Sequence, residues 1–175
     1  LLVISKKLEA LEAKLDKFKE DVIDSVQDQS NRVNSATERM IDNHFSQLES
    51  LIYIMKTLPE IKELPSTRGW AGSPDFLAQL VKIIISSKPN QVLELGSGTS
   101  TVIIGSALIQ NAHGNILSID HEINFARLTQ EKLRLNGIDS IASVMHCPLQ
   151  EYKIDGKEWL WYCLLYTSDA ADEED

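Results

Sequence analysis

The 175-residue sequence contains little cysteine, proline or glycine, with 2, 5 and 8 residues respectively. The two cysteines, Cys147 and Cys163, form no CxxC pair and have no histidine cluster beside them, which excludes a disulfide framework and a structural zinc site. This usage predicts a reducing compartment, the cytoplasm, and no metal. No apolar run approaches the roughly 20 residues that span a bilayer, so we expect no membrane partner.

Basic residues are also scarce, since 17 Lys and Arg against 26 Asp and Glu give a formal net charge of −9. An acidic chain of this kind gives no support to a nucleic-acid or anionic-membrane partner. Five of the acidic residues lie within positions 169–175, so residues 1–162 have 17 basic and 21 acidic residues and a net charge of −4. This nearly neutral remainder has no basic stripe, and we expect no nucleic-acid substrate.

The first third of the chain is predicted to be one long helix, because neither glycine nor proline occurs between Ser5 and Leu58. Residues 1–58 carry apolar side chains mostly in alternating steps of four and three, the spacing of a coiled coil. Two consecutive steps of four, from Phe18 to Val26, predict a stutter, and Gln29 and His44 place polar groups near the seam. We expect homo-oligomerisation through this helix, and packing on another domain is the alternative. The predicted seam consists of Leu8, Leu11, Leu15, Phe18, Val22, Val26, Gln29, Val33, Ala36, Met40, Leu48, Leu51, Met55 and Leu58.

Residues 59–72 are predicted to be a linker or lid, because Pro59 and Pro65 end the helix. This segment combines a cation, a flexible glycine and a large ring at Arg68, Gly69 and Trp70. Trp70 is predicted either to face a ligand or to cover the core edge of the following domain.

From residue 73 onward, helical patterns alternate with short apolar strands. Helices are predicted over 74–87, 100–110 and 122–136, and strands over 91–95, 115–120 and 141–146. Ser73 suits the N-cap of the first helix, and Gly114 and Gly137 suit the left-handed positions after the next two. Alternation of this kind predicts parallel strands with right-handed crossovers. The fold class is α/β, an incomplete Rossmann-like doubly wound sheet with the first three strands only, over residues 73–162.

The chemically informative residues come at the carboxyl ends of the predicted strands, where such sheets bind ligands. Gly96 and Gly98 remove side chains where backbone must approach a ligand, and Ser100 and Thr101 place hydroxyls at a helix N-terminus. Asp120 ends the second strand, where an acid can accept hydrogen bonds from a ribose diol. The alternatives are that the glycines only form a tight turn and that Asp120 only caps the next helix.

A dinucleotide fingerprint requires a third glycine, but Thr101 occupies that position, so a nicotinamide-dependent oxidoreductase is the less favoured alternative. The segments LPSTRGWAGSPDF, QVLELGSGTST, ILSIDHE and VMHCPL together resemble class I S-adenosylmethionine-dependent methyltransferases. The resemblance extends over roughly residues 64–162. It implies S-adenosylmethionine as cofactor and transfer of its methyl group to a small-molecule or glycan-type acceptor.

The resemblance also implies roles for individual residues. Glu94 would orient the glycine loop, Ser100 or Thr101 would meet the methionine carboxylate, and Asp120 would bind the ribose hydroxyls. His121 would flank the adenine. The implied cofactor-binding set is Glu94, Gly96, Ser97, Gly98, Ser100, Thr101, Asp120, His121, Cys147, Pro148 and Leu149.

No catalytic residue is identified by the resemblance, and Arg68, Trp70 and Asp75 are the only candidates for the acceptor side. Cys147 is expected to be a small apolar filler when it is not a cofactor contact. A hypothesis from another class is a coiled-coil assembly protein whose α/β module binds a nucleotide as a structural or regulatory ligand.

Both ends of the sequence suggest a fragment. The chain begins with Leu1, and CLLYTSDAAD, from Cys163 onward, resembles a transposase sequencing adapter translated in frame. We therefore interpret residues 163–175 as an adapter-derived, disordered segment. A class I sheet that lacks its fourth to seventh strands is expected to fold poorly in its C-terminal half and to be inactive as written.

Overall fold

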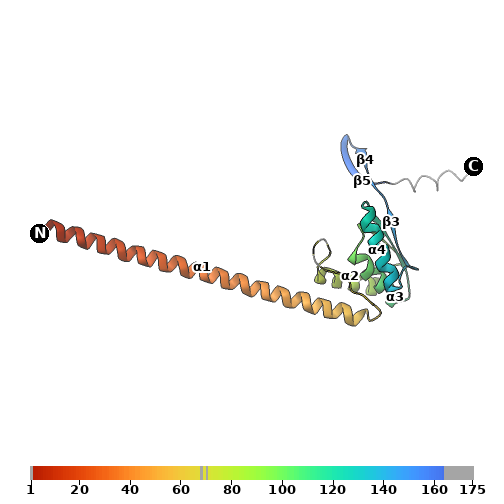
Figure 1. Ribbon diagram of the computed structural model, residues 1–175, viewed down its shortest axis with the longest axis horizontal. Helices are drawn as coiled ribbons and strands as arrows, with labels where there is room; N and C mark the ends of the chain where they lie inside the picture. The colour runs from red at the N-terminus through yellow and green to blue at the C-terminus, as the bar shows by residue number, and fades with distance from the viewer. Residues whose placement is uncertain (1, 68, 70, 164–175) are drawn as a thin grey trace, which may run out of the picture. The chain divides into compact units, whose positions relative to one another are not determined.

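A computed structural model of the chain describes residues 2–67, 69 and 71–163. The chain forms two compact units that divide between Ser46 and Gln47. The structure has an α/β architecture with a three-stranded parallel sheet and a long N-terminal helix (Figure 1). No helix in the described ranges is long and apolar enough to cross a membrane. The prediction for residues 164–175 lies outside the described residues.

Helix α1 runs over Leu2–Thr57 and confirms the long helix expected from the sequence. Its first unit is a solvated helix whose surface carries ion pairs at helical spacing, such as Lys19 with Asp16 at 3.1 Å and Arg32 with Asp28 at 2.9 Å. Exposed pairs of this kind stabilise a helix by only about 0.2–0.5 kcal/mol each. The seam side chains in this unit are exposed, so the apolar stripe of the predicted coiled coil is accessible to solvent.

The last turns of α1 belong to the second unit. Ile54 and Leu58 are buried, at 0% and 2% exposure, in the same core as the parallel sheet's helices. Met55, by contrast, is 63% exposed. The predicted seam therefore does not continue to Leu58, because that side chain packs inside the α/β unit. The boundary between the units lies within the helix instead of at its end.

The segment after α1 is attached to the α/β unit at several points. Pro65 is buried, and Leu64 packs against the core. Asn136 Oδ1 accepts hydrogen bonds from the Lys62 and Glu63 amides at 3.1 and 3.2 Å. These contacts fix the first half of the predicted linker. Arg68 and Trp70 lie outside the described residues, so the alternatives for Trp70 stay predictions.

The α/β unit has the predicted order of helices and strands. It contains α2 (Pro74–Ser87), β1 (Gln91–Leu95), α3 (Thr99–Asn111), β2 (Asn115–Asp120), α4 (Ile123–Asn136) and β3 (Ala142–His146). The strands are parallel in the order β1-β2-β3, with Leu93 beside Leu117 and Ile119 beside Met145. Helices α3 and α4 lie side by side (Figure 1), and each connects two neighbouring strands.

Alternation along β2 shows which face of the sheet the helices cover. Ile116, Ser118 and Asp120 are buried, and Ser118 reaches a side chain of α3. On β1, Leu93 and Leu95 are 62% and 50% exposed. Successive side chains of a strand point to opposite faces, so one face of the sheet is covered by helices and the other is open.

The helix ends agree with the prediction at one glycine and differ at another. Gly137 has φ 71° and ends α4 in the left-handed region, as predicted. After α3 that position is taken by Ala112, with φ 49°. Gly114 instead has φ 86°, and a Cβ there would lie 2.2 Å from the Pro89 carbonyl oxygen. Its glycine is required by close backbone approach and not by helix capping.

A two-stranded antiparallel hairpin follows β3 and was not predicted. It consists of β4 (Leu149–Ile154) and β5 (Lys157–Tyr162). The turn residues Asp155 and Gly156 have φ values of 51° and 76°. Positive φ at both central positions is typical of a type I′ hairpin turn, for which Asp-Gly is a favoured pair.

Candidate functional site

The site is built around the loop that joins β1 to α3. Gly96 has φ 90°, and its amide donates to the Ile119 carbonyl at 2.7 Å, which holds the loop against β2. A Cβ added at Gly96 or Gly98 would meet no heavy atom within 4 Å. Gly98 has φ 163° and ψ −137°, and no neighbouring atom crowds the position of a Cβ, so packing alone does not require a glycine there. Open space beside both glycines leaves room for a ligand to approach the backbone.

Glu94 holds this loop through a buried threonine. Its Oε2 accepts hydrogen bonds from Thr101 Oγ1 at 2.6 Å and from Ser118 Oγ at 2.5 Å. Thr101 Oγ1 in turn accepts the Gly98 amide at 3.0 Å. The carboxylate on β1 thus orients the glycine loop through the hydroxyl of Thr101, which is a physical route for the role predicted for Glu94.

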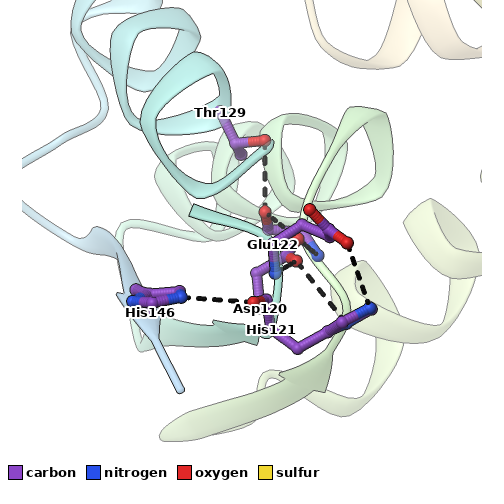
Figure 2. A network of polar contacts seen from close by, with 6 residues as sticks. Asp120, His121, Glu122, Thr129 and His146 are labelled. Atoms are coloured by element: carbon purple, nitrogen blue, oxygen red, sulfur yellow. Dashed lines mark hydrogen bonds and ion pairs between the residues drawn. The ribbon is translucent and has the colours of Figure 1, made fainter. Parts of the chain in front are cut away.

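Asp120 ties the end of β2 to the same loop (Figure 2). Its Oδ2 accepts the Ser97 amide at 2.8 Å and Ser97 Oγ at 2.6 Å, and its Oδ1 accepts the Glu122 amide at 2.9 Å. Ser97 Oγ also lies 3.3 Å from Thr129 Oγ1, on α4. Asp120 is 4% exposed. The acid and the glycine loop, 23 residues apart in sequence, are directly hydrogen-bonded.

Two opposing effects act on the pKa of Asp120. Burial raises it, but the hydrogen bonds from the Ser97 hydroxyl, the Glu122 amide and the Ser97 amide outweigh burial and leave the pKa below its ordinary value. Nearby His121 lowers it slightly further. Asp120 is therefore a carboxylate at neutral pH, which accepts and does not donate hydrogen bonds.

His121 and the segment after β3 lie beside Asp120. His121 Nδ1 is 3.9 Å from Asp120 Oδ1, and His146 Nε2 lies 3.2 Å from the His121 carbonyl oxygen (Figure 2). The Cys147 amide donates to the Asp120 carbonyl at 2.8 Å. The Cys147 thiol is buried, as expected of a small apolar filler, and burial raises its pKa, which makes it a poor nucleophile.

The hairpin brings an aromatic residue to this edge that sequence reasoning missed. The rings of His121 and Tyr162 are 6.2 Å apart between centroids and 70° apart in plane, and Trp161 meets Tyr162 edge to face. Burial raises the pKa of Tyr162, and the charges of Asp120 and Cys147 raise it further. The Asp-Gly turn signal could have located the hairpin, but nothing in the sequence placed Tyr162 beside His121.

The structure brings most of the predicted set together, but it buries Thr101 among internal partners. Thr101 is fully buried and bonds to Glu94 and Gly98, so of the two hydroxyls predicted at the helix N-terminus only Ser100 is partly exposed. Leu149 begins β4 and, with Pro148, is exposed. Ser118 and Thr129, which complete the two hydrogen-bond networks, were not predicted, because a buried serine or threonine carries no motif of its own.

Asp75, the one acceptor-side candidate among the described residues, is a poor general base. The Ser73 hydroxyl and the Phe76 amide both donate to Asp75 Oδ1, and the pKa of Asp75 is lowered, chiefly by Ser73. A general base at neutral pH needs a pKa nearer 7. Ser73 does stand at the predicted N-cap position, but its hydroxyl bonds to Asp75 instead of to a helix amide.

Buried polar side chains in the described part of the chain have hydrogen-bond partners within it. No buried side-chain nitrogen or oxygen there is without a hydrogen-bond partner. The same residues contain no group of three His, Cys, Asp or Glu side chains that could hold a metal ion. Thr99 Oγ1 donates to the Ser66 carbonyl at 2.9 Å, which attaches the preceding segment to the start of α3.

Comparisons with known proteins give a distant likeness among solved structures. No protein-family model matches the chain, and no curated protein matches it. Among solved structures, the chain is similar to the "Crystal structure of a putative O-methyltransferase from Klebsiella pneumoniae", with 21% sequence identity and a TM-score of 0.44. The match covers 62% of this chain, which spans half the length of that structure.

Proposed function

We propose that the α/β unit binds S-adenosylmethionine and supports methyl transfer to a small-molecule or glycan-type acceptor. The observation that carries the proposal is the direct bond between Asp120 and a glycine loop with open space at both glycines. A loop that only formed a tight turn would not need the open space beside Gly98, where an added Cβ would meet no atom within 4 Å. A ligand that approaches this backbone would need it.

The chain's own residues supply binding and orientation. Gly96 and Gly98 admit the ligand to the backbone, and Ser100 lies in the first turn of α3, where amides favour an anionic group such as a carboxylate. Asp120 accepts hydrogen bonds from the ribose, and His121 flanks the base. Glu94 fixes Gly98 through Thr101.

When bound, S-adenosylmethionine supplies a methyl group already activated by the sulfonium. The protein's contribution is then mainly alignment of the acceptor with the methyl carbon for an in-line displacement. Loss of loop order is therefore expected to lower both binding and rate.

Titration calorimetry with S-adenosylmethionine, S-adenosylhomocysteine and NAD tests the proposal. We expect the first two ligands to bind and Gly98→Ala to weaken them by at least about tenfold, because the new methyl group occupies ligand space. Gly98→Ala is preferable to a change at Gly96, whose φ of 90° makes any side chain a folding problem.

The matched control is Ser106→Ala, which removes a buried hydroxyl that donates only to the Val102 carbonyl of its own helix. Preference for NAD over both adenosyl ligands contradicts the proposal. Binding of adenosine with equal affinity to S-adenosylhomocysteine points instead to the alternative, a regulatory nucleotide module on an assembly helix.

We also propose that α1 associates with the α1 of a second copy. Eight seam side chains before residue 46 are each 44–65% exposed, and a solvated helix cannot bury such a stripe alone. The stripe is complementary to itself, because a parallel pairing sets each seam residue beside its own copy. The eight are Leu8, Leu11, Leu15, Phe18, Val22, Val26, Val33 and Met40.

The charged residues that flank the seam favour a parallel pairing at one position and oppose it at another. With Leu8 and Leu11 at positions a and d, Lys7 faces Glu12 of the second copy in a parallel pair, whereas Lys14 faces Lys19. Lys14→Glu is therefore expected to strengthen a parallel association.

Light scattering after size exclusion tests this association. We expect an oligomer that Leu15→Asp converts to a monomer, because the change buries an unpaired charge in the seam. Ile23→Asp is the control, since Ile23 is as exposed, at 65%, but lies off the seam. A monomer in the unmodified chain, or equal loss in both variants, contradicts a seam-mediated oligomer.

A further inference from the structure

The carboxylate of Asp120 has most of its acceptor positions filled. Three donors reach it: the Ser97 amide and Ser97 Oγ on Oδ2, and the Glu122 amide on Oδ1. A carboxylate offers about four lone-pair positions, so about one remains. A ribose diol that donates both of its hydroxyls needs two. One of the three present donors must leave before a diol can bind in this way.

Of the three donors, only the Ser97 hydroxyl is free to leave without moving the backbone. The Ser97 amide is fixed because the preceding residue, Gly96, is hydrogen-bonded to β2 through its own amide. The Glu122 amide is fixed because Glu122 stands at the start of α4, where its carbonyl accepts the Ala126 amide. The Ser97 hydroxyl needs only to turn its hydrogen about the Cβ–Oγ bond.

A second acceptor for the Ser97 hydroxyl is already in place. Ser97 Oγ is 2.6 Å from Asp120 Oδ2 and 3.3 Å from Thr129 Oγ1. A serine hydroxyl has one hydrogen, so it donates at full strength to only one of them. Thr129 is 3% exposed and is held on α4, so its oxygen stays within reach of Ser97 whether or not a ligand is bound.

We propose that Ser97 sets the site's preference for a ribose diol by competing with the ligand for Asp120, and that Thr129 accepts the Ser97 hydroxyl when the ligand binds. The inference rests on the proposed cofactor site. It gives Ser97 a role opposite to that of an ordinary contact residue, because removing its hydroxyl improves binding of the diol. Ser97 and Thr129 are positioning residues, which act on the ligand through Asp120.

The test compares S-adenosylhomocysteine with its 2′-deoxy analogue, which keeps only one ribose hydroxyl and needs only the acceptor position that remains. The measured quantity is the ratio of the two dissociation constants, analogue over parent, by calorimetry on the full chain. We expect Ser97→Ala to raise this ratio by roughly threefold to tenfold, the net contribution of one typical hydrogen bond. A lower or unchanged ratio in Ser97→Ala overturns the inference.

Thr129→Val should act in the opposite direction, because the Ser97 hydroxyl then has no second acceptor and is released from Asp120 at a greater cost. The ratio is expected to fall. In the double variant Ser97→Ala with Thr129→Val, the ratio should equal that of Ser97→Ala alone, since the second acceptor has lost its donor. Ser106→Ala is the control for removal of a partly or fully buried serine hydroxyl, and it should leave the ratio unchanged.

A measurement without ligand separates failure of this inference from failure of the proposed function. Carboxyl NMR titration of Asp120 itself should show a higher pKa in Ser97→Ala than in the unmodified chain and in Ser106→Ala. The Asp120 signal must be followed directly because His121 and Tyr162 also lie beside it. An unchanged Asp120 pKa overturns the inference while the cofactor site can stand. A raised pKa with no binding of either nucleoside refutes the cofactor site, and this inference with it.

Discussion

The two units of the chain differ in what surrounds their apolar side chains. Before residue 47, the large seam residues of α1 are exposed, as in Phe18 at 65% and Val26 at 61%. After it, side chains of similar size such as Ile103 and Leu133 are fully buried. Burial of one such side chain is worth about 1.5–3 kcal/mol. The second unit gains this free energy in a core of its own. The exposed side chains of the first unit gain it only by association with another apolar surface.

The difference teaches that helical periodicity alone does not decide where an apolar stripe goes. Within α1 the same helix carries both outcomes, because Ile54 reaches the core of the α/β unit while Met55, next to it, stays 63% exposed. The stripe predicted to continue as a seam thus ends within this chain, where its last residue, Leu58, enters the core of the α/β unit.

The largest effect is expected from truncation inside the core. Ile103→Ala should lower the free energy of unfolding of the α/β unit by about 2–5 kcal/mol, because a fully buried side chain is replaced by a cavity. Val33→Ala in α1 should leave the same transition within about 0.5 kcal/mol, since Val33 is 58% exposed. Urea unfolding followed by tryptophan fluorescence measures both, and equal losses would show that the two units unfold as one.

A smaller effect is expected from Asp120, the buried acid that ties the glycine loop to the end of β2. Asp120→Asn should cost about 1–3 kcal/mol at neutral pH, because an amide nitrogen then faces one of the three donors that Asp120 accepts.

The pKa of Asp120 is lowered in the folded state, so its stabilisation is present above the unfolded pKa of about 3.9 and is lost as pH falls through the folded pKa. The stability difference between the unmodified chain and Asp120→Asn should therefore shrink below pH 4, as urea unfolding from pH 7 to pH 3 would show. Asp139→Asn, at an exposed position, is the surface control. A difference that stays constant over this range contradicts the hydrogen-bonded carboxylate.

The smallest effect on stability is expected at the glycine loop, where a substitution should weaken ligand binding much more than folding. Gly98→Ala should change the free energy of unfolding by no more than about 1 kcal/mol, because the added methyl group meets no atom within 4 Å. Thermal unfolding measures this change beside the loss of ligand affinity. A large loss of stability would mean that Gly98 serves the turn and not a ligand.

Local signals predicted the regular elements well. The strands over β1, β2 and β3 and the helices between them follow from short apolar runs alternating with helical periodicity, and Gly137 ends α4 where its φ of 71° requires glycine. The hairpin was not predicted from the sequence, because only Leu149 of its residues was considered, as a ligand contact, although Asp155 and Gly156 carry a recognised turn signal.

Interactions between distant residues were predicted less well. The sequence placed Glu94, Gly98 and Asp120 at strand ends, which parallel topology brings to one edge. It did not predict that Thr101 is a buried bridge between Glu94 and Gly98, or that Ser97 bonds to Asp120, because a hydroxyl can serve many acceptors and only the packing selects one.

The sequence by itself determined the long helix, the α/β unit, the glycine loop and the acid that ends β2, because these depend on periodicity, turn chemistry and strand order. Only the tertiary structure decided which apolar residues of α1 enter a core, and that Ser97 and Thr129 lie beside Asp120. Burial and hydrogen-bond partners are properties of side chains brought together from positions far apart in the chain, and no local pattern specifies them.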